Sequence, residues 1–332
     1  MDGRGKKIFK YAASAVLAAA FLYWAFRSID IAEFWDGLCR TRWGYIILAS
    51  AAAVLALVFR AGRWRLQLRS LDTGIDRWHV WHGSNIGNFL NLLLPGIGEF
   101  ARCGFVRTAG CPYDRTFGTI LVERSFDVLA ILLLFLLSFA LQYDRLAPFV
   151  QTNVIDAVSG RFDLSFGVVL LVVVVAVLII FLIVRWGRER FALCRRLYDA
   201  VRGIFAGVGS FSRMPRPWLF AIYTIGIWTS YIFMSWFTLQ AVPGLENLTF
   251  SDALFISAIG NLASVVPAPG NLGPYHWLVG TALSSIYLGS SRILPAGLLF
   301  ATLGHGTRVV LVVVLGFISY ICAAIRKKKP EN

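Results

Sequence analysis

The chain has 332 residues, of which 58% are hydrophobic and only 15% are charged. Soluble domains carry about 25% charged residues, so the composition excludes an ordinary soluble enzyme and predicts a membrane protein that crosses the bilayer several times. The net charge of +14 does not predict nucleic-acid binding, because Lys and Arg stand in short loops beside apolar runs and no loop can hold a nucleic-acid-binding module.

Six apolar segments are long enough to cross a membrane, which takes about 20 residues per helix. They cover about residues 8–26, 43–60, 117–141, 165–184, 217–241 and 296–321. The first segment follows three lysines and resembles a signal peptide. Its apolar run continues past Ala18-Ala19-Ala20 through Trp24, so we expect an uncleaved first span.

Loop charge predicts the direction of each span, because cytoplasmic loops carry the excess of Lys and Arg. The N-terminus, the loops at 60–77 and 185–216, and the tail at 326–332 are strongly basic and are expected in the cytoplasm. The loops at 27–42, 142–164 and 242–252 carry mixed or acidic charge and are expected outside. The chain is therefore predicted to lie in the cytoplasmic (inner) membrane as a multi-pass protein with both termini inside.

Two further apolar regions, at about 80–115 and 253–290, consist of arms of about 12–15 residues that are short for full spans. The loops on both sides of each region are predicted on one side of the membrane. Each region is therefore interpreted as a re-entrant hairpin, which needs a buried or wet environment at membrane depth. If every arm crosses fully instead, the chain has ten spans with the same loop sides.

The two hairpin regions share a short sequence pattern. Ile86-Gly87-Asn88 is followed by Pro95, and Ile259-Gly260-Asn261 is followed by Pro267. Each half then has three crossings and one hairpin, so the second half is expected upside down. The predicted fold is an all-α integral membrane protein, an inverted-topology repeat of six crossing helices and two re-entrant hairpins, typical of carriers. The predicted parts are residues 1–142, an external loop at 143–164, residues 165–325, and a basic tail at 326–332.

Gly and Pro residues break both hairpins, and ionisable side chains follow the breaks. The residues expected to form the breaks are Pro95, Gly98, Pro267, Pro269, Gly270 and Gly273. An ionisable group in the membrane costs about 2.5–3.5 kcal/mol and is a candidate for function. The candidates are Glu99 and Arg102, then Glu123, Arg124 and Asp127, and finally His276, His305 and Arg308.

Spacing suggests how these charges pair. Glu123 and Asp127 are four residues apart and share a helix face, whereas Arg124 is expected to point elsewhere. Arg102 or Arg308 is therefore expected to serve the two carboxylates. Arg124 would then face a cavity and meet an anion, since its planar guanidinium suits phosphate.

Other polar residues have both a binding and a structural interpretation. Asn91, Asn271 and His276 could bind a lipid headgroup together with the arginines, or they could bond backbone freed at the breaks. Glu99–Arg102 could be only a structural ion pair, Arg124 could reach the headgroups by snorkelling, and His305–Arg308 could be a plain helix-face pair. Glu99, Glu123, Asp127 and His305 remain candidates for charge pairing or proton coupling.

No catalytic, nucleotide or metal motif is present in the sequence. The five cysteines are scattered, without a CxxC pair or a cluster with histidine. We therefore expect no cofactor, no metal and no catalytic residue, and no drive by ATP from this chain itself.

The motif set resembles a known family. Three stretches look like the motifs N-x-x-x-P, G-E-x-x-R and E-R-x-x-D: in turn, Asn91 to Pro95, Gly98-Glu99 with Arg102, and Glu123-Arg124 with Asp127. Residues 267–273 with Arg308 look like the motif P-x-P-G-G-x-G followed by a later R. This is similar to the lysylphosphatidylglycerol synthase transmembrane-region (flippase-like) family over about residues 45–321. Asn271 stands where the family usually has Gly, and His276 stands where many members have Glu. The soluble aminoacyl-transferase domain is lacking, so the resemblance implies a stand-alone lipid-translocase-like member without lysine transfer.

The expected function is therefore transfer of an anionic phospholipid or a polyprenyl-phosphate-type lipid between leaflets. Two alternatives remain open: a membrane-embedded transferase acting on a lipid-linked substrate, and a non-catalytic scaffold for an envelope-lipid pathway. Membrane lipids are the expected partners, with a lipid-biosynthesis enzyme as a further possible partner and no nucleic acid. The sequence does not specify an oligomeric state.

Overall fold

A computed structural model describes residues 16, 19–23, 25–27, 29–108, 111–150, 185–187, 189–191, 194–195, 198, 216–266 and 268–328. These residues form helices and connecting turns, with no strand among them. The chain divides into two compact units: Met1–Ile120 with Met214–Asn332, called unit 1, and Leu121–Arg213, called unit 2. The predicted span at 165–184, most of the predicted span at 8–26, and much of the predicted external loop lie outside the described residues.

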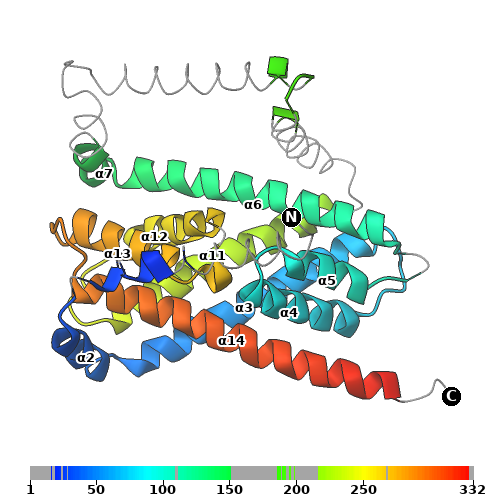
Figure 1. The fold of residues 1–332 in the computed structure, drawn as a ribbon, viewed down its shortest axis with the longest axis horizontal. Coiled ribbons are helices and arrows are strands. Elements are labelled where there is room, and N and C mark those ends of the chain that lie inside the picture. The colour runs from blue at the N-terminus through cyan, green and yellow to red at the C-terminus, as the bar shows by residue number, and fades with distance from the viewer. Residues whose placement is uncertain are drawn as a thin grey trace. The chain divides into compact units, whose positions relative to one another are not determined.

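The helices follow the chain in a simple order (Figure 1). They are α2 (Ile31–Cys39), α3 (Trp43–Leu68), α4 (Arg77–Leu93), α5 (Ile97–Phe105), α6 (Tyr113–Leu141), α7 (Tyr143–Val150), α11 (Pro217–Ala241), α12 (Phe250–Leu262), α13 (Pro274–Ala282) and α14 (Pro295–Lys328). Short 3-10 turns, η3 (Ala263–Val265) and η4 (Pro269–Asn271), separate α12 from α13, and a π-helical turn, η5 (Leu283–Tyr287), follows α13.

Local sequence signals explain where several helices begin. The Asp30 carboxylate accepts hydrogen bonds from the first backbone N–H groups of α2, and Asp76 caps α4 in the same way. Thr249 and Asp252 form a reciprocal capping box at the start of α12. Pro217 opens α11, where its missing N–H costs nothing.

Three of the described helices are long and apolar enough to cross a membrane: α3, α11, and Pro295–Ile325 within α14. Their positions confirm helices at three of the predicted spans. The predicted span at 117–141 lies within α6, which has 29 residues. One boundary was wrong. Arg60, Arg63 and Arg65 were predicted to lie in a loop, but α3 continues to Leu68 and carries all three.

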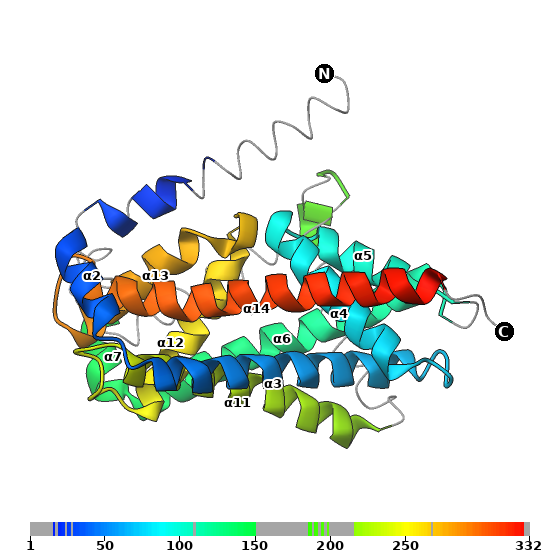
Figure 2. The ribbon, with the colours of Figure 1, turned by 90° about the horizontal axis from the view of Figure 1, so that it is seen from below.

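Helices α3 and α11 pack closely through small residues, and Figure 2 shows them side by side. Ala49, Ala52 and Ala53 form a buried face of α3 against Met234 of α11. Small side chains let helix backbones approach, which is how membrane helices associate when hydrophobicity alone gives no driving force between them. The alanine-rich stretch of the sequence therefore marks a helix–helix contact.

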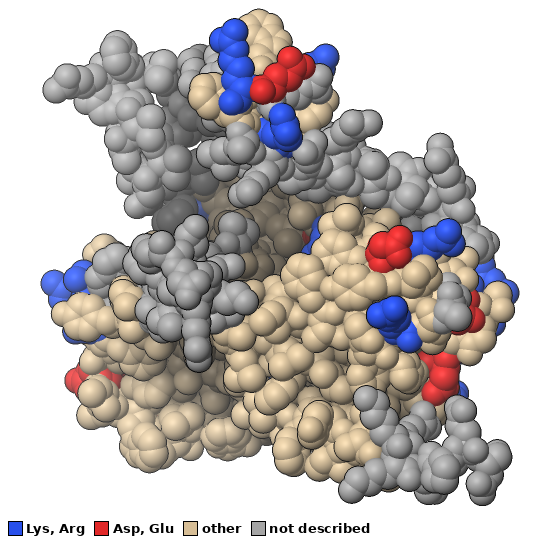
Figure 3. All heavy atoms as spheres, turned by 45° about the vertical axis from the view of Figure 1, so that its right-hand side comes forward, with Lys and Arg blue, Asp and Glu red and all other residues tan. Residues whose placement is uncertain are grey.

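Large apolar side chains also cover the outside. Ile47 of α3, Ile225 of α11 and Val310 of α14 are 70%, 65% and 60% exposed. In the view of Figure 3, much of the surface carries neither Lys or Arg nor Asp or Glu. Such a surface is unfavourable in water and suits the acyl chains of a bilayer.

Each predicted hairpin is a pair of helices joined by a break. Helices α4 and α5 have 17 and 9 residues, and α12 and α13 have 13 and 9. In Figures 1 and 2, α14 runs beside α4, so the second half of the chain packs against the first hairpin. The breaks lie close to where the sequence predicts them; the re-entrant path remains a prediction.

Cysteine labelling can test the predicted sides of the membrane. Cys39 is exposed at the end of α2, in a loop predicted outside, and Cys194 lies in a loop predicted in the cytoplasm. In variants that keep only one of the two, we expect a membrane-impermeant maleimide added to intact cells to label Cys39 and to label Cys194 only after the membrane is opened. The reverse pattern would contradict the orientation.

Cys111 provides the unreactive control for that labelling. It is buried against Leu68, and burial, together with the nearby Asp72 carboxylate, raises the pKa of its thiol. A raised pKa leaves less of the reactive thiolate at neutral pH. A variant that keeps only Cys111 should therefore label slowly in both preparations, and faster as pH rises.

Candidate functional site

The first break lies at Pro95-Gly96, between α4 and α5, and Asn91 stabilises it. The side-chain oxygen of Asn91 accepts a hydrogen bond from the backbone N–H of Gly98 at 2.8 Å, and its amide nitrogen lies 3.5 Å from a Glu99 carboxylate oxygen. Asn91 thus satisfies one of the N–H groups that the start of a helix leaves unpaired. Its observed role is to hold the backbone of the break.

The two arms of the first hairpin touch through glycine. A β-carbon on Gly98 would overlap the carbonyl oxygen of Gly87, and one on Gly87 would lie 2.9 Å from the carbonyl oxygen of Gly98. The backbones of α4 and α5 are therefore in direct contact. Gly87 belongs to the repeated Ile-Gly-Asn pattern, so this contact gives that pattern a physical reason.

Arg102 is paired and buried. Its guanidinium lies 2.7 Å from a Glu99 carboxylate oxygen, with side chains 8% and 21% exposed, and its Cζ lies 4.5 Å from the centre of the Trp64 ring. Trp64 is fully buried and donates a hydrogen bond to Thr119. The structural ion pair is thus observed, and its cation–π contact adds to it.

The second break lies between α12 and α13 and is held by a histidine from another helix. Gly270 has φ of 57° and Asn271 φ of 60°, in the left-handed region that glycine adopts without strain. His305 Nε2 lies 2.8 Å from the Gly270 carbonyl oxygen, where a ring N–H donates to it. His276 was considered as the residue that binds this backbone, but His305 does so. Pro267 lies outside the described residues.

His276 is buried beside His305. The rings of Tyr275 and His305 stack at 4.9 Å, and the ring centres of His276 and His305 are 5.6 Å apart. Among the described residues, Nδ1 of His276 and the side-chain oxygen of Asn271 are buried and meet no hydrogen-bond partner. Buried polar atoms normally have hydrogen-bond partners. Among the predicted binding residues, His276 and Asn271 therefore have atoms that could each bond a ligand.

The two breaks meet in space. A β-carbon on Gly270 would lie 2.8 Å from Cδ1 of Leu92, which is near the end of α4. The second hairpin also has a close glycine contact: Gly260 packs against the ring of Tyr275 in α13, whereas Gly87 packs against the backbone of α5. The repeated Ile-Gly-Asn pattern therefore places a glycine at a close helix contact in each hairpin.

The three helices long enough to span a membrane each contribute one residue to a group that holds two cations, called here the mid-span cluster: Arg60 of α3, Tyr231 of α11 and Arg308 of α14. Arg60 donates a hydrogen bond to the Tyr231 hydroxyl at 3.3 Å, and Arg308 Cζ lies 5.6 Å from the centre of the same ring. In the described part of the chain, no carboxylate forms an ion pair with Arg308.

Sequence reasoning identified Arg308 but missed its two neighbours. Arg60 was assigned to a loop, although the apolar residues Trp64, Leu66 and Leu68 beyond it already indicated that α3 continues. Tyr231 carried no signal, because a tyrosine in an apolar helix is ordinary. Besides sharing a helix face with the other, each residue of the pair His305–Arg308 has a contact on another helix: His305 binds the second break and Arg308 lies over Tyr231.

The third set of candidates lies in unit 2 and is described by itself. Arg124 lies 3.6 Å from an Asp127 carboxylate oxygen, three residues along the same helix. The expectation that Arg124 points away from both carboxylates was therefore wrong, because an i,i+3 pair was overlooked. Arg124 is exposed and Glu123 is 1% exposed.

No group of three or more His, Cys, Asp or Glu side chains able to hold a metal ion occurs among the described residues. The polar side chains of the mid-span cluster and the second break are arginines, a tyrosine, an asparagine and histidines. Such groups can bind an anion and orient it.

Apolar spanning helices, an apolar surface and paired broken helices define an integral membrane protein. The chain belongs to the family of the lysylphosphatidylglycerol synthase TM region, whose sequence model matches residues 11–316. It is 26% identical over 161 residues to a UPF0104 membrane protein of Pyrococcus horikoshii, which covers 47% of this chain and 44% of that protein. The match thus spans less than half of the relative's length. No solved structure matches the chain significantly.

Proposed function

We propose that this protein moves an anionic lipid between the two leaflets of the cytoplasmic membrane, with the lipid phosphate passing the mid-span cluster. The observation that carries this is the convergence of Arg60 and Arg308 on Tyr231, within three helices long enough to span. Charged side chains within a membrane are costly and mark pathways for polar cargo. A phosphate would accept hydrogen bonds from guanidinium groups there.

The breaks support the same proposal. Gly270, Asn271 and His276 bring backbone and side-chain polar groups to the second break, beside α14. Broken helices of corresponding halves line the substrate path in carriers with inverted repeats. In the proposed path, Arg308 meets the phosphate, His276 and Asn271 contact the rest of the headgroup, and the acyl chains remain in the bilayer.

Not every predicted binding residue is given that role. Arg102 is engaged by Glu99 and Trp64, so we assign it to holding the first hairpin. Arg124 is exposed and near Asp127, and remains a candidate for binding a lipid headgroup. Glu123, which is buried, remains a candidate for proton coupling, and transport that uses it would depend on the proton gradient.

Reconstitution tests this function. In liposomes with a fluorescent phosphatidylglycerol analogue, we expect Arg308→Gln to slow lipid transfer by about tenfold or more, since a hydrogen bond to a charged group contributes about 1.5–3 kcal/mol. Arg308→Lys should retain part of the activity because it keeps the charge. Arg40→Gln, which removes an exposed arginine just after α2, should transfer like the wild type.

Two results would contradict the proposal. Equal transfer by folded Arg308→Gln and wild type would remove the cluster from the path. A lipid that changes mass during incubation, as seen by mass spectrometry, would favour the transferase instead of the translocase.

A further inference from the structure

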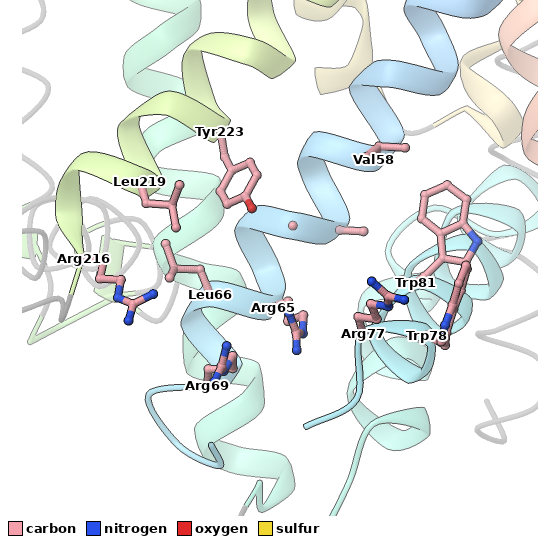
Figure 4. Close-up of a pocket in the computed structure, with 12 residues that line it drawn as sticks. Val58, Arg65, Leu66, Arg69, Arg77, Trp78, Trp81, Arg216, Leu219 and Tyr223 are labelled. Carbon is pink, nitrogen blue, oxygen red and sulfur yellow. The ribbon is translucent and has the colours of Figure 1, made fainter. Parts of the chain in front are cut away.

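A pocket of about 470 Å³ lies at the arginine-rich end of α3, apart from the mid-span cluster (Figure 4). Three helices form its walls: the second half of α3, the start of α4 and the start of α11. Its lining includes Arg65, Arg69, Arg77, Arg216, Trp78 and Trp81. The pocket is called here the arginine pocket.

The charge in the arginine pocket is of one sign. Four arginines line it, and no Asp or Glu is among its lining residues. Nε of Arg65 is buried and has no hydrogen-bond partner among the residues that the structure describes. Cations held together repel one another, and a buried donor without a partner costs about 1–3 kcal/mol. Both features favour an anion that accepts hydrogen bonds in this space.

The arginine pocket is apolar at its other end. Figure 4 shows the arginines at one end of the view and Val58 at the other, with Leu66 and Leu219 also on the walls. Trp78 and Trp81 begin α4, and Arg77 Cζ lies 5.4 Å from the Trp78 ring. Tryptophan is typical of the level where lipid headgroups meet acyl chains. A ligand with a phosphate and an attached apolar chain matches both ends.

We propose that the arginine pocket binds the phosphate headgroup of an anionic phospholipid, with the lipid in the leaflet that loop charge predicts to be cytoplasmic. Arg65, Arg77 and Arg216 hold the phosphate, and the first part of an acyl chain lies along Val58 and Leu66. This goes beyond the transfer function, because the site binds lipid whether or not the protein moves it. An anionic inner-leaflet surface supplies this lipid at high local concentration.

Native mass spectrometry of the detergent-purified full chain tests the proposal. The probes are phosphatidylglycerol, phosphatidylcholine with the same acyl chains, and glycerol phosphate. We expect phosphatidylglycerol to bind most tightly, and the double variant Arg65→Gln/Arg77→Gln to bind it about tenfold more weakly or worse. The control is Arg107→Gln/Arg115→Gln, which removes the same charge from exposed positions on the same predicted side but outside the pocket.

Equal weakening in both double variants would mean non-specific attraction and would overturn the proposal. Val58→Trp provides an independent test, because it keeps every arginine and narrows the apolar end at a position that is 47% exposed. It should weaken phosphatidylglycerol binding and leave glycerol phosphate unaffected. Unchanged lipid binding in Val58→Trp, or glycerol phosphate binding as tightly as the lipid, would show that the pocket does not recognise a phospholipid.

These results separate the arginine pocket from the transfer function. Arg65→Gln/Arg77→Gln should weaken phosphatidylglycerol binding by the same factor in the Arg308→Gln background as in the wild type, since Arg308 does not line the pocket. If the arginine-pocket variants bind normally while Arg308→Gln fails to transfer lipid, the pocket proposal fails and the transfer function stands.

Discussion

Replacing Glu99 with Gln should destabilise the protein by about 3–5 kcal/mol, because it leaves the largely buried guanidinium of Arg102 without its carboxylate. Arg102 Nη2 and Glu99 Oε2 are 2.7 Å apart, and the two side chains are only 8% and 21% exposed, so solvent screens their interaction little. The measurement is thermal or denaturant unfolding of the purified protein in detergent, which should show a clearly lowered midpoint.

The double variant Glu99→Gln/Arg102→Met distinguishes an unpaired charge from lost packing. It removes both charges and should be more stable than Glu99→Gln alone, since replacing a whole buried pair by apolar groups is often neutral. Asp36→Asn is the control, because it breaks a similar pair with Arg40 whose side chains are 72% and 55% exposed. That change should cost less than about 1 kcal/mol. Equal costs for Asp36→Asn and Glu99→Gln would contradict burial as the cause.

Adding a single methyl group at Gly98 should also destabilise the first hairpin strongly. Gly98→Ala places a β-carbon into the carbonyl oxygen of Gly87, so α4 and α5 must move apart. Overpacking of this kind costs about 1–3 kcal/mol, and here the obstacle is backbone that cannot rotate away. We expect a lower unfolding midpoint and slower lipid transfer, because Glu99 and Arg102 follow on the displaced helix.

Gly104→Ala is the matched control for Gly98→Ala. Gly104 lies in the same helix, and a β-carbon there would meet nothing within 4 Å. Alanine favours a helix over glycine by about 0.5–1 kcal/mol, so Gly104→Ala should be neutral or slightly stabilising. A loss of stability in both variants would show that α5 tolerates no substitution, and would remove the close contact as the explanation.

Much of the fold follows from the sequence because the membrane imposes simple rules. Apolar length located α3, α11 and α14, and Gly and Pro located the breaks around Pro95 and Pro269. The end of α3 did not follow, because arginines were counted as loop residues. Arg63 is fully buried and donates a hydrogen bond to Thr224 of α11. Neighbouring helices therefore accept a charge that the sequence suggests is in a cytoplasmic loop.

The candidate site was harder to predict than the fold, because it depends on contacts between distant helices. Spacing along one helix suggested which charges to consider, and it correctly allowed the Glu99–Arg102 pair. It could not show that His305 reaches the carbonyl of Gly270, or that Arg60 and Arg308 share Tyr231. These contacts depend on how α3, α11 and α14 pack.

The position of Gly270 has a mechanical consequence. One residue of the second break is restrained twice: Leu92 fills the volume beside its α-carbon, and His305 of α14 holds its carbonyl oxygen. A shift of the end of α4 would change the packing of Leu92 against this residue. Gly270 therefore links the end of α4 to α14, so a displacement of either helix would be felt at the second break.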